Sequence, residues 1–474
     1  MHGLSKSIFV SLIIIGIASL AFWFIYNPSE NITKRVPGMD QRIDMDSALS
    51  EKIQIGEQFI KYADYSSNLR GKWNVFRGPD RDNINKEKIG LISSFGGKTA
   101  DILWEVELGE GHAAPAIYNG KVYILDYDEE TKEDALRCFA LENGTELWKR
   151  SYKVHVKRNH GMSRTIPAVN DSFVVTIGPR CHVMCTNSQT GDFLWGIDLV
   201  KEYGSEMPFW YTGQCPMIEN DIAIIAPAGS SLIIGLDCAT GKVLWKTPNP
   251  GQWKMSHSSI MPMTIEGKKM YIYAAIGGIC GISAEGEDVG QILWKTNEFA
   301  PSVVAPSPQV LDDGKIFITA GYGAGAMLFK IVRDVNEYDV KILKKYKAKE
   351  GMASEQQTPI FYQDHLFGIL PKDAGPDRNQ FVCYNKDNLQ TAVWTSGQTE
   401  RFGLGPYIMA DGKFFILNDE GTVTIARLST SGFKLLDKFK VMDGQDAWGP
   451  IAIADGYLIM RDSKKMICLN MKAE

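Results

Sequence analysis

One pattern decides the fold, and it recurs in ENGTELW (142–148), SQTGDFLW (188–195), ATGKVLW (239–245) and GQILW (290–294). Each stretch ends in a tryptophan, and successive tryptophans lie 47, 50 and 49 residues apart. Alignment extends the series and places Lys344 and Asp437 in the same slot of two further units. The tryptophans of the series are Trp104, Trp148, Trp195, Trp245, Trp294 and Trp394. The chain is therefore built from repeats of about 48 residues.

A second marker follows the same period. A proline opens each of eight strand-like runs: Pro115, Pro167, Pro216, Pro262, Pro308, Pro359, Pro406 and Pro450. Each proline is soon followed by a pair such as Asn119-Gly120 or Asp411-Gly412, which tolerates the positive φ of a tight hairpin, and then by an apolar run. Eight units with four short strands each predict an all-β fold, a single eight-bladed β-propeller over residues 71–474.

The two ends of the repeat region are incomplete in complementary ways. DILW (101–104) is a fourth strand without its three predecessors, and the unit after Pro450 has three strands but no fourth. We therefore predict that residues 101–104 pair with the segment around 464–470. This pairing of N- and C-terminal strands would close the ring and leave no ragged sheet edge.

The repeated tryptophans have a structural role in this interpretation. An indole on an outer strand can pack flat on the turn of the neighbouring blade and join the two blades. The six tryptophans of the series are therefore predicted to be inter-blade residues. Irregular junctions are expected where Lys344 and Asp437 replace the indole.

The repeated strand pair, with its Thr-Gly turn and final tryptophan, resembles the pyrroloquinoline-quinone-type propellers. These include the quinoprotein alcohol dehydrogenases and the non-enzymatic propeller lipoprotein of outer-membrane protein assembly. The resemblance covers about residues 71–474, and KWNVFRGPDRDN (72–83) is similar to the opening of membrane-anchored members. It implies the fold strongly, but it does not choose between binders and enzymes, because both share the repeat.

The N-terminus predicts a membrane anchor. Residues 8–26 contain no charge, and a helix of this length spans about 28 Å. Phe22, Trp23 and Phe24 stand where a cleavage site needs small residues, so a retained single-pass anchor is favoured over a cleaved signal. Residues 1–7 are then a cytoplasmic tail, and 27–70 are a tether with a possible helix at about 45–62.

The predicted location is the bacterial inner (plasma) membrane, with the propeller on the exported, periplasmic side. Orientation stays open, because Lys6 lies on one side of the run and Lys34 and Arg35 lie on the other. The net charge of −5, from 51 basic and 56 acidic residues, gives no reason to expect a nucleic-acid partner.

The loops that lead from each outer strand to the next inner strand carry the candidate binding residues. In a propeller such loops surround the mouth of the central channel. The candidates are His112, Arg158, His160, Arg164, Trp210, Gln214, Trp253, His257, Gln357 and Trp448. They form either a ring of donors and stacking surfaces for a ligand or partner, or ordinary solvent-exposed loop side chains.

The eight cysteines are interpreted as thiols without a metal. Cys185, Cys383 and Cys468 align in a slot that also holds Ala140 and Gly235, which is typical of a small buried apolar residue. Cys181, His182, Cys185 and His160 include the ligand types of zinc or copper. On a strand, however, His182 points away from both cysteines, so no metal site is predicted.

Three functions are compatible with these residues. We favour a non-catalytic, membrane-anchored propeller that binds a protein or cell-envelope partner through its loop face, without a cofactor. The alternative is an oxidoreductase that uses pyrroloquinoline quinone with calcium, for which Glu206, Glu355 and Asp446 are available loop carboxylates. The adjacent cysteine pair of the alcohol dehydrogenase branch is absent. A second alternative is a glycan-binding propeller, which the loop aromatics suggest.

Overall fold

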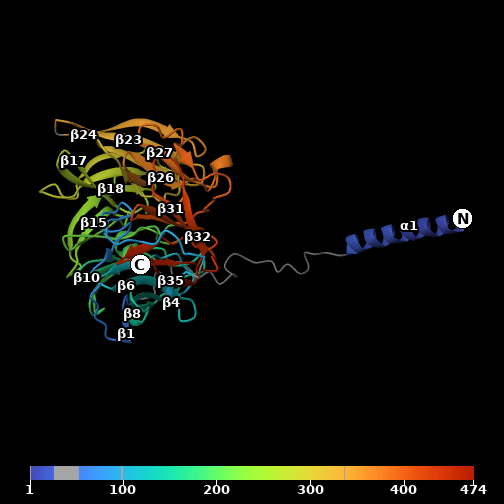
Figure 1. Cartoon of the computed structure of the whole chain (residues 1–474), viewed down its shortest axis with the longest axis horizontal. Coiled ribbons are helices and arrows are strands. Elements are labelled where there is room, and N and C mark those ends of the chain that lie inside the picture. The colour runs from blue at the N-terminus through green and yellow to red at the C-terminus, as the bar shows by residue number, and fades with distance from the viewer. Residues whose placement is uncertain (1, 26–52, 98–99, 336, 474) are drawn as a thin grey trace. The chain divides into compact units, whose positions relative to one another are not determined.

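The computed structural model describes residues 2–25, 53–97, 100–335 and 337–473, and the chain divides into the units Met1–Lys52 and Ile53–Glu474. The first unit contains helix α1 (His2–Ile25) (Figure 1). Within the described ranges, no helix is long and apolar enough to span a membrane, so the anchor predicted at residues 8–26 is not supported. The part of the predicted tether at residues 27–52 lies outside the described residues.

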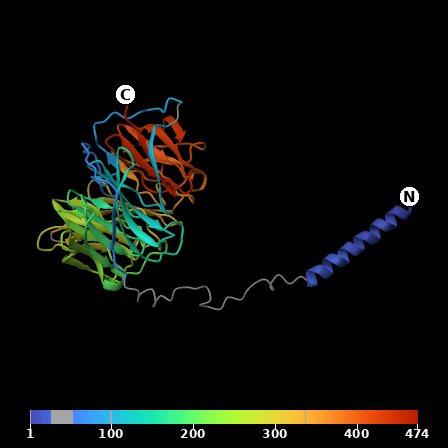
Figure 2. The same cartoon turned by 90° about the horizontal axis from the view of Figure 1, so that it is seen from below.

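The second unit is an eight-bladed β-propeller, as the repeats predicted (Figures 1 and 2). Blade 1 contains β5 (Ala116–Tyr118), β6 (Lys121–Asp128), β7 (Glu133–Ala140) and β8 (Glu146–Lys153). Blade 2 contains β9 (Ala168–Val169), β10 (Phe173–Ile177), β11 (His182–Asn187) and β12 (Phe193–Asp198), followed by α3 (Leu199–Tyr203). Blade 3 contains β13 (Met217–Glu219), β14 (Ile222–Ile225), β15 (Ser231–Asp237) and β16 (Val243–Pro248). Blade 4 contains β17 (Met261–Ile265), β18 (Lys268–Ala275), β19 (Gly278–Ser283) and β20 (Ile292–Thr296).

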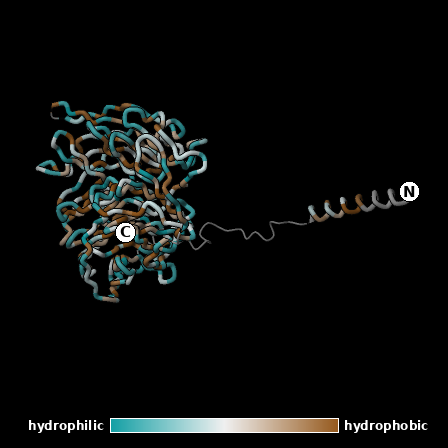
Figure 3. The backbone as a smooth tube through the Cα atoms, viewed as in Figure 1, coloured by the Kyte–Doolittle hydropathy of each residue, from teal (hydrophilic) through white to brown (hydrophobic). Residues whose placement is uncertain are grey.

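The remaining blades repeat the arrangement. Blade 5 contains β21 (Gln309–Val310), β22 (Lys315–Ala320), β23 (Gly325–Asp334) and β24 (Glu337–Tyr346). Blade 6 contains β25 (Ile360–Tyr362), β26 (His365–Ile369), η2 (Gly375–Asp377), β27 (Phe381–Asn385) and β28 (Trp394–Thr395). Blade 7 contains β29 (Tyr407–Ala410), β30 (Lys413–Leu417), β31 (Thr422–Arg427) and β32 (Leu435–Lys440). Blade 8 contains β33 (Ala452–Ala454), β34 (Tyr457–Arg461), β35 (Lys465–Asn470) and β4 (Ile102–Glu107). Hydrophobic stretches recur throughout the body of the propeller (Figure 3).

Blade 8 confirms the predicted ring closure. Strand β4 pairs antiparallel with β35, and Trp104 lies opposite Cys468. The last sheet is therefore completed by a strand that precedes all the others of the ring in sequence. Pairing the two ends of the chain in one sheet satisfies backbone groups that would otherwise form an open edge.

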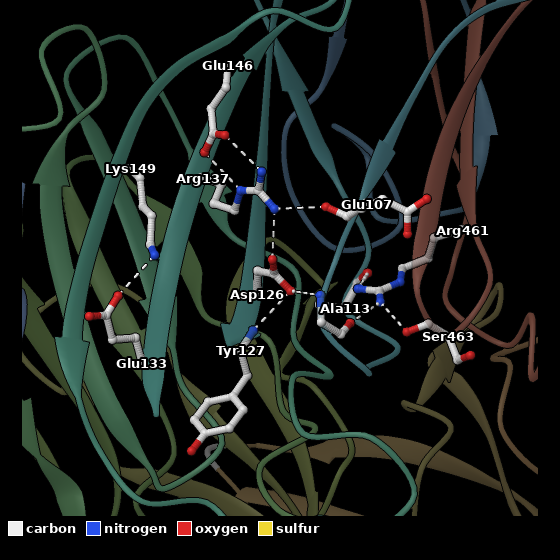
Figure 4. A network of polar contacts seen from close by, with 11 residues as sticks. Glu107, Ala113, Asp126, Tyr127, Glu133, Arg137, Glu146, Lys149, Arg461 and Ser463 are labelled. Carbon is white, nitrogen blue, oxygen red and sulfur yellow. Dashed lines mark hydrogen bonds and ion pairs between the residues drawn. The ribbon is translucent and has the colours of Figure 1, made fainter. Parts of the chain in front are cut away.

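A polar network joins blade 8 to blade 1 at this closure (Figure 4). Arg137 on β7 forms a bidentate pair with Glu146, binds Asp126 at 2.9 Å, and donates to the carbonyl of Glu107 on β4 at 3.0 Å. Arg461 on β34 donates from Nη2 to the carbonyls of Gly109 and Ser463, at 3.0 and 2.8 Å. Two arginines thus connect the first and last blades through charge-assisted hydrogen bonds.

The repeated tryptophans lie on the glycine turns of the next blade. A Cβ at Gly144 would lie 2.7 Å from the ring of Trp104, and a Cβ at Gly241 would lie 2.7 Å from the ring of Trp195. The indole nitrogens of Trp104 and Trp195 each donate to a carbonyl of the neighbouring blade at 2.8 Å. Trp148 and Trp245 cover Gly191 and Gly290 in the same way, whereas Trp294 packs on Phe329 and Trp394 donates to the carbonyl of Ser429.

The two units without the tryptophan use other contacts. Lys344 donates to the side chain of Gln390 in blade 6. Asp437 accepts hydrogen bonds from Ser94 and from the backbone of Phe95, both at 2.7 Å. Polar bonds therefore take the place of the indole at these positions.

The small-residue slot lies directly opposite the tryptophan on the third strand. Cys185 faces Trp195, Cys383 faces Trp394, and Cys468 faces Trp104. A Cβ at Gly235 would lie 2.2 Å from Trp245, so the ring leaves room for little in this slot. In blade 1 the slot is occupied by Cys138, two residues before the aligned Ala140, which corrects the alignment. All eight cysteines are buried and unpaired.

The N-terminal boundary of the propeller differs from the prediction. Residues 58–61 form strand β1 (Gln58–Lys61), which pairs antiparallel with the outer strand β8. The tether predicted to reach residue 70 therefore ends before β1, and the described part of the predicted helix, residues 53–62, is not helical. Cross-strand hydrogen bonding to β8 fixes this segment, and its short sequence contains no signal for that distant pairing.

Asp134 makes the stability of the propeller depend on pH. This carboxyl on β7 is fully buried and accepts a hydrogen bond from Tyr152 Oη at 2.7 Å. Burial raises its pKa to about 7, against the lowering effect of the Tyr152 hydrogen bond. The folded protein thus holds a proton that the unfolded chain, with a pKa of about 3.9, releases.

We expect the contribution of Asp134 to the free energy of unfolding to be largest below about pH 4 and to fall as the pH rises to about 7, by up to roughly 1.4 kcal/mol per pH unit. Asp134→Asn should remove this part of the pH dependence. Urea unfolding of both proteins at a series of pH values from 4 to 8 measures the effect. If the free energy of unfolding changed with pH in the same way in the wild type and in Asp134→Asn, the role of Asp134 would be contradicted.

Candidate functional site

A segment near the N-terminus crosses the central channel of the propeller. Strand β2 (Lys72–Trp73) pairs with β5 of blade 1, and β3 (Ile84–Asn85) pairs in parallel with β29 of blade 7. Between them, Asn74 exchanges hydrogen bonds with Val169 of blade 2. Residues 72–85 thus connect the inner strands of several blades, and we call them the crossing segment.

Arg77 fixes the middle of the crossing segment. Its guanidinium donates to the Thr358 carbonyl at 2.6 Å, to the Gln309 side chain at 2.9 Å and to the Pro359 carbonyl at 3.0 Å. These partners belong to blades 5 and 6, on the far side from β5. Burial lowers the pKa of Arg77 to about 10, so the group stays charged at neutral pH.

A cavity of about 350 Å³ lies between the crossing segment and the loop face. Trp73 and Arg77 line it and are buried, whereas Tyr322 and Lys372 line it and are exposed. The crossing segment is therefore the floor of the cavity, and the loops form its mouth. We call this cavity the central pocket.

Seven of the ten candidate binding residues line the central pocket. These are His112, His160, Arg164, Trp210, His257, Gln357 and Trp448. They come from the loops before the inner strands of different blades, which converge at the channel as the propeller geometry predicts. The structure therefore brings most of the predicted set together around one space.

Three of the candidates lie elsewhere. Arg158 is exposed and pairs with Glu110 at 2.7 Å. Gln214 is buried and bonds both backbone groups of Ala226, so it holds its own loop against β14. Trp253, predicted to be an exposed loop residue, is only 9% exposed and packs on Gly277 and Gly278. That prediction is wrong. Gly277 and Gly278 have no Cβ, so the indole packs directly against their backbone and is buried.

Two stacked ring pairs shape the central pocket. Trp210 stacks on Tyr322, from the β22–β23 turn of blade 5, with centroids 5.7 Å apart and planes at 16°. His112 stacks on Trp448 with centroids 5.0 Å apart and planes at 23°. Because each pair joins residues from different blades, rings from separate loops present flat surfaces at the pocket.

Two histidines of the pocket are neutral. Burial, together with the charges of Arg164 and Arg461, lowers the pKa of His112 to about 3. Burial and Arg164 lower the pKa of His257 to about 4. Both rings are therefore uncharged near pH 7 and act as hydrogen-bonding or stacking groups.

Arg164 holds the loops at the mouth. Its Nε donates to the Trp210 carbonyl at 2.6 Å, and its Nη2 donates to the carbonyls of His160 and Asn159. None of these partners is a carboxylate. Burial lowers the pKa of Arg164 to about 10, so it remains a cation in the pocket wall.

Sequence reasoning missed several pocket residues. Trp73, Phe76 and Arg77 belong to the WNVFRGP stretch. The one sequence signal that could have indicated them is an arginine that closely follows three large apolar residues. Tyr322 and Lys372 sit in turns with no distinguishing motif. Lys372 pairs with Glu355 at 3.0 Å and lies 5.2 Å from the Tyr322 ring centroid.

The oxygen ligands that the pocket offers do not fit the calcium ion that accompanies the quinone in the alternative hypothesis. Among the described lining residues Glu355 is the one carboxylate, and it is engaged by Lys372. Glu206 is exposed and pairs with Lys254, and neither it nor Asp446 lines the cavity. Calcium prefers six to eight oxygen ligands that include carboxylates, which this set does not supply.

Comparison with known proteins agrees with the fold. The family model of the outer membrane protein assembly factor BamB matches residues 132–396, more than half of the chain. The solved BamB from Moraxella catarrhalis is 12% identical, with a TM-score of 0.51 over 80% of this chain and 99% of that one. No curated protein sequence matches.

Enzymes share the architecture. The quinohemoprotein alcohol dehydrogenase ADHIIG from Pseudomonas putida HK5 is 12% identical, with a TM-score of 0.56 over 85% of this chain and 81% of that one. A europium-containing methanol dehydrogenase is 11% identical, with a TM-score of 0.54 over 84% of this chain and 89% of that one. Likeness at these identities shows the fold alone.

Proposed function

Because the chain belongs to the family of the outer membrane protein assembly factor BamB, we propose that it is a non-catalytic scaffold that binds a protein or cell-envelope partner through its loop face. Support comes from the mouth of the central pocket, where Phe209 is 77% exposed and Tyr322 is 58% exposed. Phe209 packs edge-on against Trp210, so three aromatic rings adjoin one another at the surface.

We call Phe209, Trp210 and Tyr322 the aromatic rim. Large exposed aromatic side chains in contact with one another are typical of interface anchors, because their burial against a partner removes much apolar surface from water. The pocket chemistry supports the same choice, because Glu355 is the one carboxylate among the described lining residues and its Oε1 is paired with Lys372. We keep the exported location as part of the proposal, on the support of the uncharged run at residues 8–26.

Replacing Phe209 and Tyr322 together with serine should lower partner capture at least tenfold, because interface anchors carry most of the binding energy. The free energy of unfolding should change by no more than about 1 kcal/mol, since both side chains are exposed. Capture is measured by photo-crosslinking from a benzoylphenylalanine at position 207, because Met207 is 37% exposed, lies two residues from Phe209 and is unchanged in the variant. Val335, 83% exposed in the β23–β24 turn, provides the matched control position.

Equal crosslinking from positions 207 and 335 would argue against a specific interface at the rim. The quinoprotein alternative has its own test: purified protein is given pyrroloquinoline quinone, calcium and an alcohol or sugar. Reduction of an artificial electron acceptor in this assay would overturn the non-catalytic assignment. We expect no reduction above the protein-free rate.

A further inference from the structure

One carboxylate oxygen in the central pocket has no partner. Glu355 is 5% exposed, and its Oε1 accepts from Lys372 at 3.0 Å, whereas Oε2 is buried without a hydrogen bond among the described residues. The side chain is held in place, because a Cβ at Gly321 would lie 2.4 Å from Glu355 Cγ. A buried acceptor without a donor is costly, so this oxygen is suited to accept a hydroxyl from a bound molecule.

The pocket also carries uncompensated positive charge. Arg77, Arg164 and Lys372 face the single negative charge of Glu355, which gives three cations minus one anion, or a formal charge of +2. The two guanidiniums bond carbonyl and amide oxygens and no carboxylate. Nη1 of Arg164 has no hydrogen-bond partner within the described part of the chain. A ligand carboxylate would satisfy this donor in a strong, charge-assisted bond.

Flat surfaces and further polar groups complete the pocket. The Trp210–Tyr322 and His112–Trp448 pairs offer ring faces for stacking. Gln356 and Gln357 add side-chain amides that can bond hydroxyls, although Nε2 of Gln357 already donates to the Trp448 carbonyl at 3.2 Å. The volume of about 350 Å³ lies in the usual range of small-molecule sites, roughly 300–1,000 Å³.

We propose that the central pocket binds an acidic sugar of hexuronate type. Its carboxylate is bound by Arg164 Nη1, one of its hydroxyls donates to Glu355 Oε2, and one face of its ring lies on the aromatic pairs. A neutral sugar would leave the excess positive charge unmatched. An aromatic hydroxy acid would leave most of the amide groups unused. The inference goes beyond the partner role of the loop face, because this ligand enters the channel and needs no second protein.

Calorimetry of the full chain with D-glucuronate, D-glucose and 4-hydroxybenzoate tests the proposal. We expect D-glucuronate to bind at least tenfold more tightly than either of the other two, with an affinity that falls as salt rises. Glucose of equal or higher affinity, or 4-hydroxybenzoate of equal or higher affinity, would overturn the proposal. So would the absence of glucuronate binding at millimolar concentration.

Two pocket variants test whether Arg164 and Glu355 bind the sugar. Arg164→Gln should lower the glucuronate affinity at least tenfold, whereas Arg158→Gln, an exposed change outside the pocket, should leave it unchanged. Because Arg164 also supports the loops, Glu355→Gln provides a second variant. It should weaken glucose more than glucuronate, because it removes the negative oxygen that accepts a hydroxyl but also raises the formal charge of the pocket from +2 to +3. Unchanged glucuronate affinity in Arg164→Gln, or unchanged glucose affinity in Glu355→Gln, would refute the assignment. Rim crosslinking is measured without sugar, so failure here is separate from failure of the partner proposal.

Discussion

Replacing Arg137 with methionine should lower the free energy of unfolding by about 2–3 kcal/mol, less than the roughly 3–5 kcal/mol for one partner of a fully buried ion pair, because these ion pairs are partly buried. The Arg137 side chain is 18% exposed and neutralises both Asp126 and Glu146. Burial alone would lower its pKa, but the ion pairs with Glu146 and Asp126 outweigh burial and raise it. Without the guanidinium, Glu146 and Asp126 both lose their ion pair, and Asp126 keeps two backbone donors and the charge of Arg461.

Urea unfolding measures this loss. Lys345→Met provides the matched control, because Lys345 pairs with Glu298 on the surface with both side chains about half exposed. Exposed pairs contribute little, so this variant should unfold almost like the wild type. A similar loss of unfolding free energy in both variants would show that the ion pairs of Arg137 stabilise the protein no more than an exposed ion pair does. The same comparison also measures how much the contact between the first and last blades stabilises the protein, because Arg137 donates to the backbone of β4.

Replacing Trp195 with alanine should also cost about 3–5 kcal/mol, as expected for emptying a large aromatic site in a core. Trp195 is buried, covers Gly241 of blade 3, and donates its indole proton to the Cys238 carbonyl at 2.8 Å. Removal therefore opens a cavity and leaves a carbonyl without its donor. Differential scanning calorimetry and urea unfolding measure the effect.

Phe209→Ala is the control for Trp195→Ala, because Phe209 is an exposed aromatic of the rim and should cost far less. Trp253→Ala should lower the free energy of unfolding by an amount similar to Trp195→Ala, because this indole is buried on Gly277 and Gly278. Equal, small losses for Trp195→Ala and Phe209→Ala would contradict the inter-blade role.

The candidate site was predictable in part. The loops that lead to the inner strands are predicted from the sequence to surround the mouth of the channel, and His112, Arg164, Gln357 and Trp448 of these loops do line the pocket. Gln214 occupies the same position in its repeat but bonds Ala226 instead. Position in the repeat thus gives the distance from the axis, whereas rotamer and hydrogen-bond competition decide whether a side chain reaches the pocket.

The sequence by itself determined the ring: its eight blades, the turns, and the closure of β4 on β35. Those features follow from strands, turn pairs and tryptophans that recur at a fixed period, so each repeat carries the same local information. The floor of the pocket was decided only by the tertiary structure. Arg77 bonds Thr358, which is 281 residues away in the chain, and no periodic pattern encodes a contact that occurs once. The same reason applies to Trp253, because its burial depends on two glycines of the next blade and not on its own loop.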